Sequence, residues 1–324
     1  MARFLVEPKI KGDLIAGTEG DGTLAYVGKI AEIGDAKRKF WFGGSKEFVG
    51  LIIGARGSGK SHTLGAIAES FATKDDQTSV SRHEARRGML LFDPMGNFWT
   101  MATAASKDGA KKAREQFAQL SGWDCEVEDV NVDVWIPAGN KRDTDSDNIK
   151  EFRVKVCDLG EADIADLVGV NLIRDPQGAA LSEAYHAVVE DGWNDGYRNV
   201  PPNSNYVFQD LVDYLEYLSN NGNTDHQRST LNALKRSMRS LIRQDVFTGN
   251  GTPLTDLLVP GRLGILMLPH RIGEHLRLVI TRLLIRRILM EREAAAQIRQ
   301  RLDVEVLDEA KKEELEKKEP LRLL

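Results

Sequence analysis

The chain has 324 residues, of which 41% are hydrophobic and 29% charged, so it can bury a large core in one or two domains. Its formal net charge of -5 argues against a protein that coats nucleic acid nonspecifically, although a net charge does not reveal basic side chains confined to a narrow pore. Cys125 and Cys157 lie far apart without a zinc-ligand pattern, and no apolar run approaches the roughly 18 residues that a membrane span needs. We therefore expect a cytoplasmic protein without a membrane segment.

The first 46 residues contain many glycines and short apolar runs, which predict small strands and turns. The compact apolar run at residues 48–53 predicts a buried strand. Helical spacing of apolar residues follows over residues 60–71. A second short strand is predicted at residues 89–92, and it ends at Asp93. This order of strand, glycine loop, helix and strand indicates an α/β core.

Between about residues 101 and 250 the pattern is mostly helical, and we interpret this block as an insertion into the sheet. The helices are expected at 101–120, 161–168, 178–191, 208–219 and 226–243, with extended segments at 130–136 and 152–157.

Residues 263–268 predict another buried strand, and residues 274–301 a strongly apolar helix. The charged stretch at 309–319 favours a helix whose simplest interpretation is a solvated surface or linker. Apolar strands that alternate with helices are typical of a parallel sheet covered on both faces. The predicted fold class is therefore α/β.

The sequence from Gly54 to Ser61 matches the complete G-x-x-x-x-G-K-[ST] phosphate loop. Its glycines allow backbone amides to turn inward at a helix N-terminus, where phosphate is favoured. Lys60 should reach the β- and γ-phosphates of ATP, and Ser61 should place its hydroxyl on Mg²⁺. A glycine-rich turn without a ligand is the alternative, which the strand and helix context disfavours. The predicted nucleotide-binding residues are Gly54, Ala55, Arg56, Gly57, Ser58, Gly59, Lys60, Ser61 and His62.

Asp93 follows a predicted strand at the sheet edge where α/β folds place ligands. As a catalytic residue it would orient water or Mg²⁺, whereas in a structural role it would cap the turn before Pro94, and spacing alone does not separate the two. Hydrolysis also needs an acidic pair after another strand. Asp308 and Glu309 offer one, but the charge of Glu305 favours a surface position. Because residues 321–324 look like the start of a buried strand, we expect the chain to stop before its acidic Walker B motif.

Three segments in order resemble the HerA-like branch of the HerA and FtsK ATPases. They are Ile53-Gly-Ala-Arg-Gly-Ser-Gly-Lys-Ser-His-Thr-Leu-Gly65, Leu91-Phe-Asp-Pro-Met-Gly96, and Gly261-Arg-Leu-Gly-Ile-Leu-Met-Leu268 before a long apolar helix. The helical insertion also looks like that of the family. The resemblance implies a RecA-like P-loop ATPase domain over residues 47–324, preceded by a β-rich segment over 1–46 in which such proteins often carry a small barrel.

The same resemblance implies a homo-oligomeric, hexameric ring that uses ATP and Mg²⁺ to translocate double-stranded DNA, as a translocase or helicase, often with a nuclease or another effector. Asn97 stands where the family often has an acidic residue, which puts a carboxylate role there in doubt. A trans-acting arginine is also usual in the family. Arg282, Arg286 and Arg287 are candidates for it, although solvation on a helix surface is the simpler interpretation.

Two functions from different classes therefore compete. The first is a DNA-translocating ring ATPase, and the second is a regulatory or scaffold subunit that uses ATP to assemble a ring around an effector. A small-molecule kinase would also need the phosphate loop, but it does not explain the large helical insertion. The six histidines show no metal-ligand spacing.

Overall fold

The computed structural model describes residues 6–8, 13–17, 23–30, 38–44, 49–83, 86–221, 224–306 and 308–318. The chain forms two compact units. The first comprises Met1–Trp135, Thr255–Met267 and Arg322–Leu324, and the second comprises Ile136–Leu254 and Leu268–Leu321. The boundary predicted after residue 46 lies within the first unit and stays a prediction. None of the helices in these described ranges combines the length and apolarity of a membrane span.

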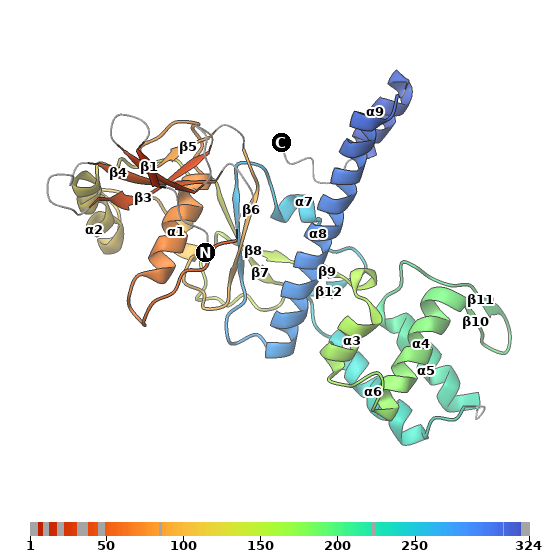
Figure 1. The fold of residues 1–324 in the computed structure, drawn as a ribbon. Coiled ribbons are helices and arrows are strands. Elements are labelled where there is room, and N and C mark those ends of the chain that lie inside the picture. The colour runs from red at the N-terminus through yellow and green to blue at the C-terminus, as the bar shows by residue number, and fades with distance from the viewer. Residues whose placement is uncertain are drawn as a thin grey trace. The chain divides into compact units, whose positions relative to one another are not determined.

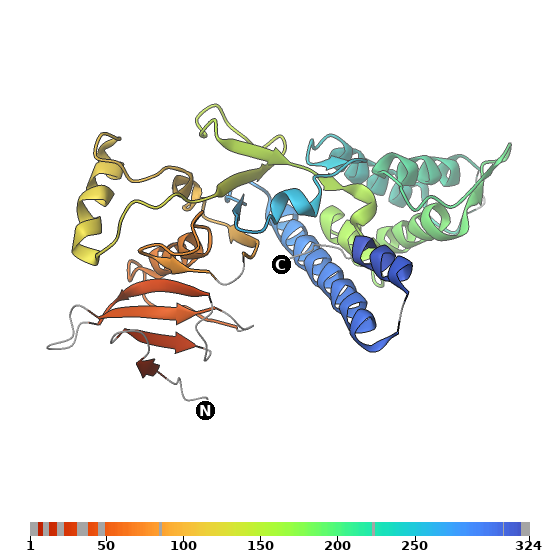
Figure 2. The same cartoon turned by 90° about the horizontal axis from the view of Figure 1, so that it is seen from above.

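A five-stranded sheet opens the first unit, and its strands are drawn in red and orange in Figure 2. Tyr26 and Trp41 pack edge to face in its core beside Ile15 and Leu24. Burial raises the pKa of Tyr26 to about 12, with smaller contributions from Cys125 and nearby aspartates. In order across the sheet the strands are β1 (Val6–Pro8), β2 (Leu14–Gly17), β4 (Lys39–Gly43), β3 (Leu24–Lys29) and β5 (Ser81–Arg82).

Helix α1 (Lys60–Phe71) joins this sheet to the rest of the unit, because it contacts β3 on the one hand and β13 (Leu263–Met267) on the other. Its end packs closely against the sheet: a Cβ added to Gly44 would overlap the ring of Phe71. After α1 the chain returns to the same sheet and adds β5 to it. Contacts with β3 and with β13 therefore hold α1 in place.

A second sheet contains the parallel strands (Figure 1). Within the first unit β13 lies between β6 (Met89–Asp93) and β7 (Val132–Pro137), parallel to both. All five residues of β13 are buried. In the second unit β7 ends beside β8 (Ile149–Phe152), where the Ala138 amide donates to the Phe152 carbonyl at 2.9 Å. The predicted α/β class with a parallel sheet flanked by helices is confirmed.

The strand expected before the phosphate loop is wrong over residues 49–53, which form no strand. The side chains of Val49, Leu51 and Ile53 are exposed, at 103%, 82% and 82%. An apolar run becomes a strand only where a neighbouring strand takes up its backbone hydrogen bonds, and no described strand pairs with this segment. Phe48 lies outside the described residues.

The helix predicted over 101–120 is only partly right. A 3₁₀ turn, η1 (Trp99–Ala102), is separated from α2 (Lys111–Leu120). Between them the Ser106 hydroxyl accepts the Asp108 amide at 3.3 Å. Such local side-chain bonds compete with helical ones, and Gly109 further weakens the helix.

The helices of the second unit agree with the predictions to within a few residues at their ends. The extended segment expected at 152–157 is instead divided among β8, β9 (Val154–Lys155) and a 3₁₀ turn, η3 (Val156–Asp158). Figure 2 shows α8 as one long straight helix. The helical elements are α3 (Glu161–Val168), α4 (Pro176–His186) with a π-helical continuation η4 (Ala187–Asp191), α5 (Phe208–Asn221), α6 (Arg228–Ile242), α8 (Glu274–Val304) and α9 (Glu309–Lys318).

The smaller elements are short pairs and one turn of helix. Strand β9 pairs in parallel with β12 (Phe247–Thr248), and β10 (Trp193–Asn194) forms an antiparallel hairpin with β11 (Asn199–Val200). Helix α7 (Leu254–Leu257) precedes β13, and the carbonyl of Leu257 lies so close to Gly264 that a Cβ at that strand position would overlap it.

Ion pairs between α8 and the region of α3 use the three arginines considered for a trans-acting role. The carboxylate of Asp163, 1% exposed, accepts the Gly160 amide at 2.9 Å. It also pairs with Arg282 at 2.6 Å and Arg286 at 2.7 Å. Arg287 pairs with Asp158 at 2.7 Å. These ion pairs give all three arginines a structural role within the second unit.

We expect Asp163→Asn to lower the free energy of unfolding by about 2–3 kcal/mol, because two guanidinium groups lose a buried counter-charge. The exposed neighbour Asp166 pairs with Arg282 at 2.6 Å, and Asp166→Asn is the control, expected to cost about 1 kcal/mol or less. Urea denaturation of both variants would measure the difference, and equal losses would contradict a special role for Asp163.

The same carboxylate should affect acid stability. Burial opposes ionisation of Asp163, but hydrogen bonds from Gly160, Arg286 and Arg282 outweigh it and lower its pKa. Its contribution to stability is therefore present above the unfolded-state pKa of about 3.9 and is lost as pH falls through the lower folded-state value. Urea denaturation repeated from neutral to acid pH should show a weaker pH dependence in Asp163→Asn than in the parent chain.

Candidate nucleotide-binding site

The phosphate loop takes its shape from two glycines with left-handed backbone. Gly57 has φ 81° and Gly59 has φ 90°, a region that other residues enter only with strain. Gly59 is the N-cap of α1 and its carbonyl accepts the Thr63 amide at 2.9 Å. The Ser58 amide donates to the Ala55 carbonyl at 3.2 Å. The loop therefore turns directly into the helix N-terminus.

Lys60 lies against the beginning of the loop. Its Nζ donates to the carbonyls of Gly54 and Ala55, both at 2.8 Å. Position 54 lies close to Ser58, because a Cβ there would overlap the Ser58 hydroxyl unless that hydroxyl rotated away. The lysine is thus held at the loop through two hydrogen bonds that a bound polyphosphate would replace with stronger ones, in which donor and acceptor are both charged.

The charges around the loop favour an anion. Arg56 is exposed in the same loop that ends at Lys60, and the first turn of α1 carries no acidic residue. Ser61 and His62 are also exposed on that turn. The partial positive charge of the helix N-terminus adds to these groups. The predicted nucleotide-binding residues are therefore contiguous and accessible.

The residues present also suit Mg²⁺ bound with a nucleotide. The described residues contain no group of three or more His, Cys, Asp or Glu side chains that could hold a metal ion by themselves. Mg²⁺ usually keeps several waters and binds to phosphates with one or two protein ligands. Ser61 is exposed in the first turn of α1, and its hydroxyl has the chemistry of such a ligand.

The carboxylate of Asp93 accepts hydrogen bonds from the turn that follows it. Its side chain is buried, with 1% exposure. Oδ1 accepts the amides of Met95 at 3.2 Å and Gly96 at 2.8 Å, and Oδ2 accepts the Phe98 amide at 2.9 Å. Of the two roles that the sequence leaves open, these contacts support the turn cap.

The Asp93 turn reaches α1, a contact that sequence analysis missed. A Cβ built on Gly65 would lie 3.5 Å from the Phe98 ring and 3.9 Å from the Met101 sulfur. These two side chains therefore pack over the middle of the phosphate-loop helix. A glycine inside a helical pattern was the available signal, since it costs about 1 kcal/mol relative to alanine unless packing requires it.

Asp308 and Glu309 lie at the start of a separate helix. Helix α8 continues to Val304, and the next described residues include a fully exposed Val306. The Asp308 carboxylate accepts the Lys311 amide at 2.8 Å near the start of α9. The surface position favoured from sequence is therefore observed. Residues 321–324 lie outside the described residues.

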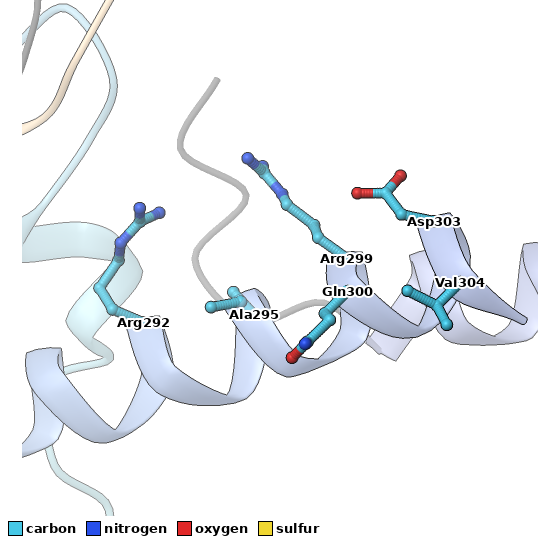
Figure 3. A pocket seen from close by; sticks show the side chains of 7 residues that line it. Arg292, Ala295, Arg299, Gln300, Asp303 and Val304 are labelled. Carbon is cyan, nitrogen blue, oxygen red and sulfur yellow. The ribbon is translucent and has the colours of Figure 1, made fainter.

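A shallow hollow runs along the second half of α8 (Figure 3). Its described lining residues are all on this helix, and they include none of the phosphate loop. The figure shows Arg292, Arg299, Gln300 and Asp303 along the helix. The lining residues are Arg292, Ala295, Ala296, Arg299, Gln300, Asp303 and Val304.

Comparison with known families gives a match that contains the loop and the Asp93 turn. The family model for Helicase HerA, central domain, matches residues 50–288, more than half of the chain. The chain belongs to this HerA central-domain family. It is thus a member of a P-loop ATPase family whose proteins are generally oligomeric. A comparison with curated proteins found no match.

We expect opposite effects of alanine at two glycines of this region. Gly59→Ala should lower the free energy of unfolding by about 1–2 kcal/mol and weaken ATP binding, because φ is 90° there. Gly65→Ala should be neutral or stabilise by up to about 1 kcal/mol, because its Cβ would make ordinary contacts inside a helix. Urea denaturation and titration with a fluorescent ATP analogue would test both, and a tolerated Gly59→Ala would contradict the loop geometry.

Asp93→Asn separates the two roles of this side chain. If Asp93 caps its turn, the substitution should lower the free energy of unfolding by about 1–2 kcal/mol. The reason is that the amide nitrogen of asparagine would face one of the three backbone amides that the carboxylate now accepts. The Mg²⁺ concentration needed for half-maximal ATP-analogue binding should not change. Ser61→Ala, which removes the proposed Mg²⁺ ligand, is the comparison, and a Mg²⁺ shift confined to Asp93→Asn would contradict the cap assignment.

Proposed function

We propose that this chain is the ATP-binding and hydrolysing motor subunit of a cytoplasmic HerA-like ring that translocates double-stranded DNA with a nuclease or another effector. The observation that carries the proposal is the phosphate loop, in which Gly57 and Gly59 turn the backbone into α1 and Lys60 lies over the loop carbonyls. Membership of the HerA family supports the ring and its hexameric form.

The proposed roles follow the chemistry of each group. Lys60 binds the β- and γ-phosphates and stabilises the charge that develops during transfer, while Ser61 holds Mg²⁺, which neutralises phosphate charge. Arg56 and His62 flank the phosphates, and the loop amides from residues 54–61 bind them. Asp93 acts by holding the turn that packs on α1.

One observation favours the alternative, an ATP-dependent assembly or regulatory subunit without DNA translocation. The carboxylate of Asp93 is occupied by three backbone amides, and that of Asp308 accepts the amide of Lys311. These hydrogen bonds already engage both carboxylates, which disfavours either as the group that activates water for hydrolysis. A subunit that binds ATP without hydrolysing it would still assemble in a nucleotide-dependent way.

Lys60→Ala should abolish ATP binding or turnover with little change in the free energy of unfolding. The reason is that the Lys60 ammonium donates to two loop carbonyls from a half-buried position at the loop, so it contributes charge to a ligand rather than packing to the core. ATP hydrolysis with and without double-stranded DNA, ATP-analogue binding and solution mass would be measured for both proteins.

The outcomes of that experiment separate the two functions. DNA-stimulated hydrolysis by an oligomer, lost in Lys60→Ala, would establish the motor. ATP-dependent assembly without hydrolysis or DNA binding would support the scaffold subunit. Undiminished ATP binding by Lys60→Ala would count against the site itself.

A further inference from the structure

Helix α6 carries an arginine-rich face. Its sequence, Arg-Ser-Thr-Leu-Asn-Ala-Leu-Lys-Arg-Ser-Met-Arg-Ser-Leu-Ile, contains basic residues and no acidic ones, and Arg243 follows as its C-cap. At 3.6 residues per turn, Arg228, Arg236, Arg239 and Arg243 fall within an arc of about 80° and along about 22 Å of the axis. All four are exposed. We call these four residues the arginine stripe.

The opposite side of α6 is buried. Leu231, Leu234, Met238 and Leu241 are all in the core of the second unit, where α6 contacts α3, α4 and α5. The helix is therefore held rigidly by its apolar side. Its stripe is presented to solvent along a straight line.

The stripe serves helix stability only in part, because Arg239 in the last turn and Arg243 at the C-cap favour the helix dipole whereas Arg228 does not. Arg228 lies in the first turn, where a cation opposes the helix dipole and no acidic residue compensates it. Arg239 stands three residues from Arg236 and four from Arg243, and each like-charged pair at these spacings costs about 0.2–0.5 kcal/mol. An anion bound outside the helix would offset these repulsions.

Most of the stripe lacks an internal partner. Among the described residues only Arg239 has an acidic partner, Glu216 on α5. Lys235, beside the stripe, donates to the Ser219 hydroxyl. No described side chain forms a hydrogen bond or ion pair with the guanidinium groups of Arg228, Arg236 or Arg243. The acidic residues near this face are Glu216 and the exposed Asp213 of α5, and Asp225 and Asp245 beyond the ends of α6.

We propose that the arginine stripe binds the sugar–phosphate backbone of double-stranded DNA. Guanidinium groups bind phosphate in a bidentate manner and are weakly hydrated, which suits arginine better than lysine for this contact. A duplex offers a regular line of phosphates that matches a rigid line of cations, whereas carboxylates of a protein partner follow no such repeat. This inference rests on the proposed function for the choice of DNA.

The test replaces the three arginines without an internal partner: Arg228→Gln, Arg236→Gln and Arg243→Gln together in the full chain. The control removes the same charge from exposed residues of the α2 region, through Lys107→Gln, Lys112→Gln and Arg114→Gln. Binding of a fluorescein-labelled DNA duplex is followed by fluorescence anisotropy at several salt concentrations. Thermal unfolding checks that the α6 variant remains folded, with an unchanged or higher Tm.

The α6 variant should bind the duplex at least about tenfold more weakly at low salt, and its slope of log K against log salt should fall by about 2–3. The control should bind nearly as the parent chain does. Equal losses in the two variants, or undiminished binding by the α6 variant, would overturn the proposal. A parent chain that binds the duplex only weakly and without salt dependence would also overturn it and would point to an acidic protein partner.

ATP-analogue binding, measured on the same samples with Lys60→Ala as reference, separates this inference from the proposed function. The α6 variant should bind the analogue as the parent chain does, because the stripe shares no residue with the phosphate loop. Absence of analogue binding in the parent chain would contradict the proposed function. The duplex titrations would still decide the role of the stripe.

Discussion

The first unit depends on β13 being placed between β6 and β7. This strand joins parts of the chain that are more than 120 residues apart, and all five of its residues are buried. Its register puts Met267 opposite Asp93 and so determines where β6 ends and where the Asp93 turn begins. Contact of α1 with the same strand then relates the phosphate-loop helix to that turn. Non-local pairing of this kind has a high entropic cost in folding, which the burial of the strand offsets.

The candidate site combines a local and a non-local part. The phosphate loop is local: its glycines, Lys60 and the start of α1 follow one another in the chain. The Asp93 turn is non-local, and it reaches the helix through Phe98 and Met101 over Gly65. We interpret this packing as a contact that keeps the phosphate loop in its orientation while phosphates are bound. A site built this way can lose function through a residue that never touches the ligand.

The basic side chains of this acidic chain have two different roles. In the second unit Asp163 and Asp158 pair with the arginines of α8, so those cations stabilise the fold. At the phosphate loop Arg56 is exposed, and along the arginine stripe of α6 the like charges repel one another and Arg228 opposes the helix dipole. The net charge of -5 hides this contrast. Cations that weaken their own helix are the better indication of an external anion.

The sequence by itself determined the phosphate loop, the α/β class, the family and most helices, because glycine patterns and helical periodicity are local properties. It did not determine whether residues 49–53 form a strand, since that depends on a partner for their backbone, and it left Asp93 between two roles. Tertiary structure alone showed that the Asp93 carboxylate accepts backbone amides of its own turn, that Arg282, Arg286 and Arg287 form ion pairs within their unit, and that Phe98 packs over Gly65. These outcomes depend on contacts between residues distant in the chain, which no local pattern records.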